Sequence, residues 1–475
     1  MERFSRSEYQ LLWLVAAGFF MQTLDSTIVT TALPAMAISL HESPLRMQSV
    51  IIAYTLTMAM LIPASGWLAD RLGTRTTFFC AIAVFVLGSA LCAASSTLRA
   101  LALSRIVQGA GGSMLLPVGR LAVLRNVPPQ RYLPALALVT IPGLVGPLIG
   151  PTAGGWLSEY YSWHWIFLIN IPVGVVGAVL TLRIMPQTRG VRRDAFDLVG
   201  YSMIAVAMLA ISLALDGLAE LHLQHALVLV LFVFGLAALS AYWLHASQRP
   251  RPLFTPQLFR VASFSIGLLG NLFSRIGSGA VPFLLPLTLQ IGLGYTPLQS
   301  GLMMVPAAVA AMLTKRPVTP LIMRHGYRRV LMANTLLLGA AIASLGLVGP
   351  GEPLWLRIIQ FALFGAVNSL QFTAMNTLTL KDLGAERASS GNSLLSMVQM
   401  VSMSFGVAAA AALLTTFTQM LGAVRPLQVL RAFHLSFLCA GCITVAATWV
   451  FSQLSGELPS RGEREREREV DVAPS

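Results

Sequence analysis

Uncharged, apolar runs of about 20 residues recur along the whole sequence, and short polar stretches between them carry most of the charge. A run of this length crosses the hydrocarbon core of a bilayer as an α-helix. The chain is 475 residues long and 56% hydrophobic but only 11% charged, whereas soluble domains carry about 25% charged residues. The alternating strands of a membrane barrel are not found in the sequence. The sequence therefore predicts an all-α polytopic membrane protein.

These runs define fourteen candidate spans, and the charge of the loops supports the count. With the N-terminus inside, 25 of the 32 Lys and Arg residues fall on the inside, four fall outside and three fall within spans. Lys and Arg collect in cytoplasmic loops. We therefore expect a multi-pass protein of the cell (inner) membrane with both termini cytoplasmic, and the net charge of +13 needs no nucleic-acid partner. The candidate spans are 11–36, 47–68, 76–96, 99–120, 132–156, 164–185, 198–217, 224–246, 262–290, 297–318, 328–348, 354–377, 390–416 and 430–453.

Two short motifs recur at nearly the same spacing. RIVQ at 105–108 and RIIQ at 357–360 open the fourth and twelfth spans, 252 positions apart. RLGTR at 71–75 and RHGYR at 324–328 follow the second and tenth spans, 253 positions apart. Both motifs therefore recur eight spans further along the chain. A six-helix half that is duplicated, with two helices inserted between the copies, would give this spacing. The predicted parts are an N-terminal six-helix bundle (1–190), two inserted helices (191–250), a C-terminal six-helix bundle (251–453) and a cytoplasmic tail (454–475).

The loop after the second span has the sequence GWLADRLGTR. Its glycines permit close helix approach and a tight turn, its aspartate can accept hydrogen bonds, and its arginines anchor the cytoplasmic face. The loop resembles the G-x-L-a-D-r-x-G-r-k signature of the major facilitator superfamily, with Thr74 where the family has a basic residue. The resemblance implies a fold of two six-helix bundles and a cytoplasmic latch between them. The latch residues are Gly66, Asp70, Arg71, Gly73 and Arg75.

Asp25 and Arg105 are charged residues that fall within the first and fourth spans. At 1.5 Å per residue, Asp25 lies about 21 Å into its span and Arg105 about 9 Å into its own. Such groups are costly unless they pair or face water, and they commonly serve proton transfer. The alternatives are a structural Asp25 and an Arg105 that snorkels to the surface. Residues 24–34 resemble the first-helix motif of fourteen-helix drug:proton antiporters, with Thr30 in place of Asn. This resemblance, and that of the fourth span to a second superfamily signature, imply that Asp25 and Arg105 couple protons.

Helix breakers are concentrated in the fifth span, with four glycines and two prolines at 146–155. These residues break helices in water, but in a bilayer neighbouring helices satisfy the backbone and small residues allow close packing. The spacing resembles the antiporter signature g-x8-G-x3-G-P-x2-G-G, which implies an exporter. We expect this helix to lie nearly backbone-to-backbone on the other half and to seal one side of the cavity. The motif residues are Gly146, Gly150, Pro151, Gly154 and Gly155.

The resemblance implies a central cavity lined by the first, fourth, ninth and twelfth spans. Asp25 and Arg105 would face it, so that one acid meets three arginines, and Lys315 is expected just inside the membrane edge. Lipophilic cations call for acids and aromatic rings. A net basic cavity suits neutral or anionic solutes better, such as organic acids or metal chelates. The cavity residues expected from the second half are Asn271, Arg275, Arg357, Asn368 and Gln371.

Together these features predict a proton-coupled exporter of small molecules that works by alternating access and serves multidrug efflux. An exporter of an organic anion, metabolite or chelate and a proton-coupled importer are the alternatives, and the sequence does not separate protons from sodium. No nucleotide loop, metal cluster or nucleophile–base pair is found in the sequence, so neither an enzyme nor ATP drive is predicted. The expected partners are the substrate, protons and lipid, bound by a monomer without a cofactor, metal or nucleic acid.

Overall fold

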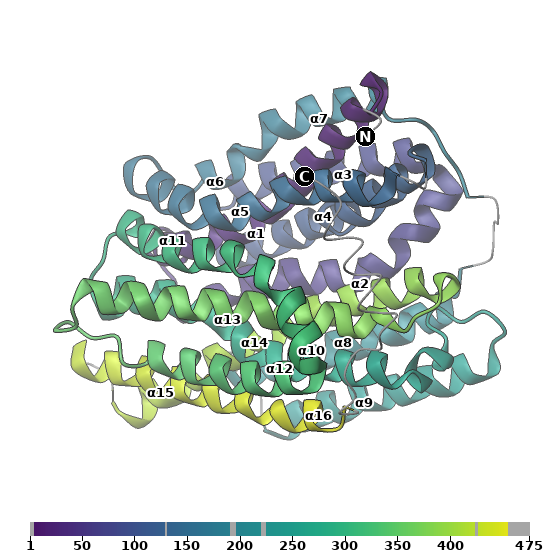
Figure 1. The fold of residues 1–475 in the computed structure, drawn as a ribbon. Helices are drawn as coiled ribbons and strands as arrows, with labels where there is room; N and C mark the ends of the chain where they lie inside the picture. Colours follow the sequence, from purple (N-terminus) through teal and green to yellow (C-terminus); the bar gives the residue numbers. More distant parts are fainter. Residues whose placement is uncertain (1–3, 129–130, 191–195, 220–224, 423–425, 455–475) are drawn as a thin grey trace.

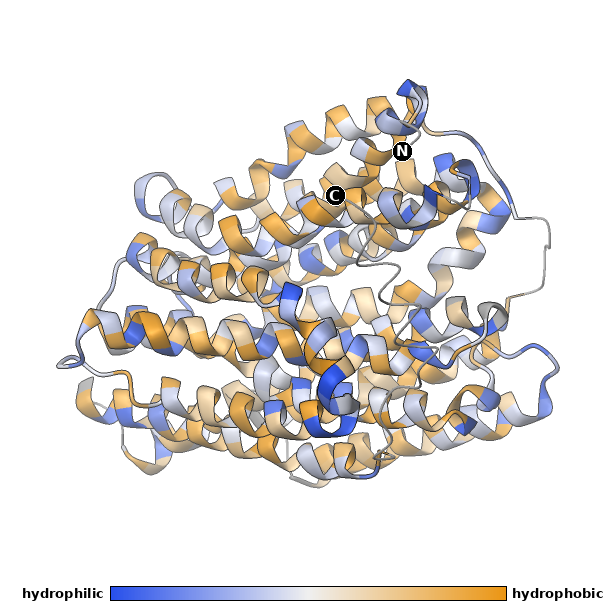
Figure 2. Ribbon diagram, in the orientation of Figure 1, coloured by the Kyte–Doolittle hydropathy of each residue, from blue (hydrophilic) through white to orange (hydrophobic). Residues whose placement is uncertain are grey.

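The protein is helical throughout the part that the structure describes, and this part contains no strand. Thirteen helices or joined helices there are long and apolar enough to cross a membrane, and Pro297–Leu313 is a shorter apolar helix, which together match the fourteen spans expected. Hydrophobic residues line most of these helices (Figure 2). Residues 455–475 of the predicted tail lie outside the described part. The computed structural model describes residues 4–128, 131–190, 196–219, 225–422 and 426–454.

The first half of the chain forms the upper bundle in Figure 1. Its first helix begins in a capping box, in which the side chains of Ser5 and Glu8 each accept the other residue's backbone N–H. Its second and third helices meet at Gly73, whose φ of +93° favours glycine. The helices of this half are α1 (Arg6–Ser39), α2 (Gln48–Leu72), α3 (Thr74–Ala93), α4 (Leu98–Asn126), α5 (Tyr132–Tyr160), α6 (Trp165–Leu168) and α7 (Asn170–Ile184).

The second half forms the lower bundle and repeats the turn at Gly73. Gly326, from the recurring motif, has φ +77° and ψ 156°, against φ 93° and ψ 155° at Gly73. These two turns share a backbone conformation that is essentially restricted to glycine, which supports the predicted repeat. The helices of this half are α10 (Ala262–Leu287), η4 (Thr288–Gly292), α11 (Pro297–Leu313), α12 (Lys315–Leu345), α13 (Leu354–Lys381), α14 (Ala385–Met420), α15 (Pro426–Ala446) and α16 (Thr448–Ser452).

The tenth predicted span, 297–318, is broken at Thr314, between α11 and α12. Pro317 has no N–H to donate to the carbonyl four residues earlier, so the helical hydrogen-bond ladder is interrupted here. The helix then continues past residue 318 as far as the turn at Gly326. The tenth span is therefore two helical segments and extends beyond its predicted end.

The inserted helices pair with each other, and the first of them packs on α2 and α14, one from each half. The Asp197 carboxylate caps the first of them by accepting a hydrogen bond from Gly200 N at 3.0 Å. It also accepts from Leu253 N at 3.2 Å and from His245 Nε2 at 2.8 Å. Burial raises the pKa of Asp197, but the three hydrogen bonds outweigh burial and hold this pKa below its ordinary value. The inserted helices are α8 (Leu198–Ala219) and α9 (His225–Gln248).

Asp197→Asn is expected to lower the midpoint of thermal unfolding at neutral pH. Hydrogen bonds to a charged group contribute about 1.5–3 kcal/mol each, and the substitution weakens three of them. Because the folded-state pKa is lowered, the carboxylate stabilises the fold above its ordinary pKa of 3.8 and loses this contribution as the pH falls through the folded value. Unfolding scans of the purified protein should therefore show a difference in midpoint between the variant and the wild type that becomes smaller below pH 3.8. An equal difference at all pH values would contradict the stabilising role given to this carboxylate.

The hydrophobic core joins the two halves over only part of the bundle. We call the end at which α1 begins the near end and the end at which it finishes the far end. At the far end, Leu33 of the first half and Phe361 of the second belong to one cluster of buried residues. At the near end, Phe78 and Ile322 belong to separate clusters, one in each half. A further cluster joins Leu56 of α2 to Leu394 of the second half, so burial of apolar surface holds the halves together at the far end and at the middle of α2.

Candidate functional site

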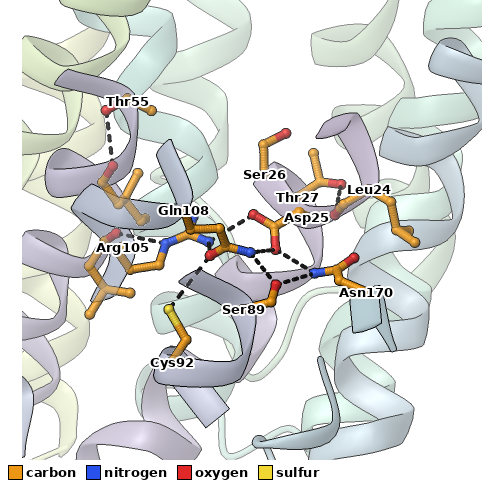
Figure 3. A network of polar contacts seen from close by, with 12 residues as sticks. Leu24, Asp25, Ser26, Thr27, Thr55, Ser89, Cys92, Arg105, Gln108 and Asn170 are labelled. Atoms are coloured by element: carbon orange, nitrogen blue, oxygen red, sulfur yellow. Dashed lines mark hydrogen bonds and ion pairs between the residues drawn. The ribbon is translucent and has the colours of Figure 1, made fainter. Parts of the chain in front are cut away.

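A buried carboxylate on α1 is the centre of a polar network in the first half (Figure 3). Asp25 is 0% exposed, and its Oδ2 lies 2.8 Å from Arg105 Nη1 of α4. Its Oδ1 accepts hydrogen bonds from Gln108 Nε2 at 2.7 Å and from Asn170 Nδ2 at 2.9 Å. Ser89 Oγ accepts from the same two amides, at 2.7 and 3.1 Å. Four helices, α1, α3, α4 and α7, therefore converge on this site.

The Arg105 guanidinium is as enclosed as the carboxylate with which it pairs. The side chain is 1% exposed, and its Cζ lies 4.0 Å from the centroid of the Tyr54 ring. Its Nε donates to Val50 O at 3.3 Å, and its Nη1 donates to Gln108 Oε1 at 2.7 Å. Snorkelling to the surface is therefore wrong for Arg105. Removing one partner of a buried ion pair costs about 3–5 kcal/mol, so each of these two side chains stabilises the buried position of the other.

Several residues of this site were given no role from the sequence. Ser89, Asn170 and Tyr54 all lie in apolar spans, and a polar side chain in such a span is a signal for a functional interior. Their spacing could not place them beside Asp25, because they come from α3, α7 and α2. The rotation of those helices about their axes is decided by packing between helices.

A cavity of about 400 Å³ lies between the two halves. Among the described residues that line it, the charged ones are Arg275 and Lys315, and none is acidic. The Arg275 guanidinium lies 4.4 Å from the centroid of the Phe372 ring, and its buried Nε has no hydrogen-bond partner in the described part of the chain. The cavity is therefore basic, as expected. Its other polar lining residues are Ser26, Thr27, Thr30, Ser274, Ser278, Asn368, Ser369 and Gln371.

The buried ion pair does not line this cavity. Ser26 and Thr27 on α1 face the cavity, whereas Asp25 faces the interior of the first half. Successive residues of an α-helix point about 100° apart, so one helix carries the carboxylate and the cavity wall on different faces. The prediction that one acid meets three arginines across the cavity is therefore wrong.

Two of the five cavity residues predicted from the second half also lie elsewhere. Asn271 is 0% exposed and donates to Gly267 O of its own helix at 3.0 Å. Arg357 lies at the start of α13, at the far end, and donates to the hydroxyl of Tyr295. The remaining three, Arg275 and the two amides already named, line the cavity as predicted.

The glycine-rich stretch of α5 packs mainly on α1, within its own half. A Cβ added at Gly146, Gly150 or Gly154 would overlap atoms of α1. Thr31 Oγ1 of α1 donates to Pro151 O at 2.9 Å and fastens the two helices together. The expectation that this stretch lies on the other half is therefore wrong for these three glycines, because the close approach that they allow is used inside the first bundle.

A narrow seam joins α5 to α11 of the second half at the far end. A Cβ added at Gly155 would overlap the carbonyl of Pro297, and one added at Gly301 would overlap the carbonyl of Pro151. Glu159 Oε2, at the end of α5, accepts from a backbone N–H of α11 at 2.9 Å. The predicted backbone-to-backbone contact with the other half is therefore present at Gly155.

The described contacts of the predicted latch lie within the first half. Asp70 forms an ion pair with Arg125 of α4, and Arg75 Nε donates to Met185 O at 2.7 Å. A Cβ added at Gly66 would meet no atom within 4 Å, so the expected close helix approach is absent. The physical reason is the separation of the halves at the near end, where this loop lies.

Thr74, which replaces the basic residue of the family signature, contacts the segment that follows α7. Thr74 Oγ1 donates to Pro186 O at 2.9 Å and lies 2.9 Å from the hydroxyl of Thr188. The Arg71 guanidinium lies 5.3 Å from the centroid of the Trp67 ring. The loop therefore holds the segment that leads from α7 toward the inserted helices.

The fold and the buried ion pair define a polytopic α-helical membrane protein with a polar site inside one half and a cavity between halves. The chain belongs to the Major Facilitator Superfamily, whose family model matches residues 15–407 and 267–473. It is 50% identical over 446 residues to "Putative multidrug resistance protein MdtD" of Serratia proteamaculans, covering 94% of this chain and 93% of that protein. It is 51% identical over 449 residues to the protein of the same name from Yersinia enterocolitica, covering 94% and 95%.

Solved structures of other transporters share the fold. The POT family transporter PepTSo superposes with a TM-score of 0.69 at 12% identity, covering 96% of this chain and 100% of that chain. A D-xylose-proton symporter superposes with a TM-score of 0.68, also at 12% identity, covering 95% and 99%. The homologues and the fold are those of a transporter superfamily and not of enzymes.

Proposed function

We propose that the protein is a secondary active exporter, which moves a small molecule out of the cell as protons move in. The near end is then the cytoplasmic side, since most loop Lys and Arg residues fall there. Both termini are cytoplasmic and the chain crosses the inner membrane as a monomer, with the proton gradient in place of a cofactor. The description shared by its relatives supports a role in multidrug resistance.

The observation that carries this proposal is the sealed pair of Asp25 and Arg105. A charged pair with 0% and 1% exposure inside a membrane protein is costly, and such groups are typical of proton relays. A proton on Asp25 would leave Arg105 as a buried charge without a partner, so the first half would favour a different arrangement. The protonation state of one carboxylate can therefore bias a conformational equilibrium.

The contacts of α1 connect Asp25 to the cavity and to the far-end seam. The helix carries Asp25 on one face and cavity residues on another, and Thr31 fastens it to α5. The same α5 forms the far-end seam through Gly155. The far end is closed, and the described contacts of the latch do not reach the second half, so we assign this conformation to the inward-facing state.

The proton and the substrate then bind on different faces of the same helix, α1.

Transport into proteoliposomes under an imposed pH gradient tests the proposal. We suggest a panel of ethidium, a cation, carboxyfluorescein, an anion, and chloramphenicol, which is neutral. At least one compound should move against its gradient when protons flow the other way, and a sodium gradient should not replace the protons. Proton-dependent uptake into right-side-out vesicles would instead identify an importer, and movement of no compound under any gradient would contradict coupled transport of this range of molecules.

The cavity favours anionic solutes, such as organic acids or metal chelates, as a second candidate substrate class. Arg275 and Lys315 line it without any acidic side chain, and the buried Nε of Arg275 lacks a partner among the described residues. An anion would supply the missing acceptor. A lipophilic cation would instead bring a further positive charge into the same space.

Arg275→Gln is expected to lower transport of carboxyfluorescein by about tenfold or more, because a hydrogen bond to a charged group contributes about 1.5–3 kcal/mol. Transport of neutral chloramphenicol should change little. Initial rates in proteoliposomes measure both, and Arg316→Gln, at an exposed position next to Lys315 in the sequence, is the matched control. Export of ethidium alone, unaffected by Arg275→Gln, would rule out the anionic class.

A further inference from the structure

The second half contains its own cluster of an acid, an arginine and a glutamine. Arg357 and Gln360 repeat the spacing of Arg105 and Gln108, and their carboxylate is supplied by Glu352, just before α13. Gln360 Nε2 donates to Glu352 Oε1 at 2.9 Å, and Arg357 Nε lies 3.7 Å from Glu352 Oε2. The glutamate and arginine side chains are 9% and 7% exposed. The repeat therefore pairs each Arg-x-x-Gln motif with a buried carboxylate, taken from a different element in each half.

The two carboxylates differ in how well they are satisfied. Both oxygens of Asp25 accept hydrogen bonds. In Glu352, Oε2 is buried and accepts none from the described residues, and the facing Nε of Arg357 also lacks a hydrogen-bond partner there. A buried oxygen without a donor carries a desolvation cost that a bound proton would relieve. The cluster also lies at the far end, where protons from outside arrive.

Arg357 connects this carboxylate to the far-end seam. It donates to the hydroxyl of Tyr295 and to the carbonyl of Gly349, so it ties the start of α13 to the segment between η4 and α11. That segment leads directly into Pro297, whose carbonyl packs against Gly155 of the first half. The position of Arg357 therefore bears on the contact that closes the far end.

In the part of the chain that the structure describes, few titratable groups approach Glu352. Arg357 faces its carboxylate, and the hydroxyl of Tyr295 contacts Arg357. From α15, His434 Nε2 bonds to Val348 O at 3.1 Å, on the loop that leads to Glu352. His434 contacts that backbone and not the carboxylate, so the charge opposite Glu352 is that of Arg357.

We infer that Glu352 is a second proton-binding site, separate from Asp25, and that a proton there loosens the far-end seam. The inference deepens the proposed function and rests on it, since it adds a group that senses protons outside. When Glu352 Oε2 takes up a proton, Arg357 becomes a buried cation without an opposite charge. The guanidinium then moves toward water and releases Tyr295, which frees the segment before α11. Loss of the proton restores the pair and closes the seam.

The distance across the seam tests this inference without any substrate. We suggest spin labels at Tyr160 of α5 and Leu302 of α11, two exposed far-end positions, after replacement of the native cysteines. In bilayers, a fall in pH should raise the population with a long inter-label distance. Glu352→Gln, which mimics the protonated carboxyl, should show this population at neutral pH and lose the pH response. We expect a change of about tenfold or more in the open-to-closed ratio, as for the loss of one charge-assisted hydrogen bond.

Two further variants make the result specific. Glu352→Asp keeps a carboxylate and should keep a pH response, which separates charge from a general loss of packing. Glu42→Gln removes a far-end carboxylate that also pairs with an arginine, at 2.6 Å, but in the first half, on the loop between α1 and α2. It should behave as wild type. A wild-type pH response in Glu352→Gln would overturn the inference, and so would an equal loss in Glu42→Gln.

Failure of the proposed function can be told apart from failure of this inference. If proton-driven transport survives Asp25→Asn while Glu352→Gln abolishes the pH response of the seam, the role of Asp25 fails and the far-end proton site stands. If Asp25→Asn abolishes transport and Glu352→Gln leaves the pH response intact, the proposed function stands and the far-end site fails.

Discussion

Asp25→Asn is expected to reduce proton-driven transport to background while the protein still inserts in the membrane. Asn can still accept from Gln108 and Asn170, but it carries no charge opposite Arg105 and cannot exchange a proton. Downhill exchange of the same compound at equal pH should persist, since Asp25 does not line the cavity. Initial rates in proteoliposomes, with and without a pH gradient, measure the two effects.

The effect of Asp25→Asn on the stability of the fold has to be separated from its effect on proton-coupled transport. Removing one partner of a buried ion pair costs about 3–5 kcal/mol, so Asp25→Asn should also unfold at a lower temperature. The double variant with Arg105→Gln removes both charges and should recover part of the stability but none of the coupling. Asp382→Asn, at a half-exposed carboxylate of the near end, is the matched control. Wild-type gradient-driven rates in Asp25→Asn would contradict the role given to this residue.

Substitution by valine is expected to have different effects at two adjacent glycines of α5, Gly154 and Gly155. A valine at Gly154 would overlap the Ile28 carbonyl of α1, inside the first half. A valine at Gly155 would overlap the Pro297 carbonyl, across the seam. Overpacking costs about 1–3 kcal/mol. At Gly154 the overlap destabilises the folded first half. At Gly155 it destabilises only the conformation in which the far end is closed.

Thermal unfolding and cysteine accessibility measure this contrast. Gly154→Val should lower the unfolding midpoint with little change in which end is open. Gly155→Val should unfold near the wild-type temperature and favour a far-end-open conformation. A cysteine placed at Ser300, a buried position of α11 beside Gly301, should then become accessible to an impermeant reagent added from that side. The two alanine variants should show the same directions with smaller effects. Equal destabilisation by both valine variants would refute the division of α5 between the two halves.

Much of the fold could be read from local features of the sequence. The apolar runs and the alternation of basic loops led to fourteen crossings, and the recurring glycine motif led to two turns that share one backbone conformation. The pairing of Asp25 with Arg105 was anticipated only as a shared role, because no spacing rule links α1 to α4. Ser89 and Asn170 completed the site from two further helices.

Other predictions failed where the orientation of a helix mattered. The Asp25 carboxylate lies behind the cavity wall, Arg357 lies beyond its far end, and three of the four motif glycines face α1. Each of these residues is in the span where it was expected. What differed was the direction in which the side chain points.

The sequence by itself determined the number of crossings, the class of fold and the kinds of polar group buried in the membrane. Bilayer insertion acts on each segment separately, through its length, its hydropathy and the charges at its ends. Only the tertiary structure decided that the Asp25 carboxylate and the cavity occupy different faces of α1, and that Gly155 alone of the motif glycines meets the second half. Those facts depend on how each helix is rotated, and this rotation is set by the packing of all its neighbours at once.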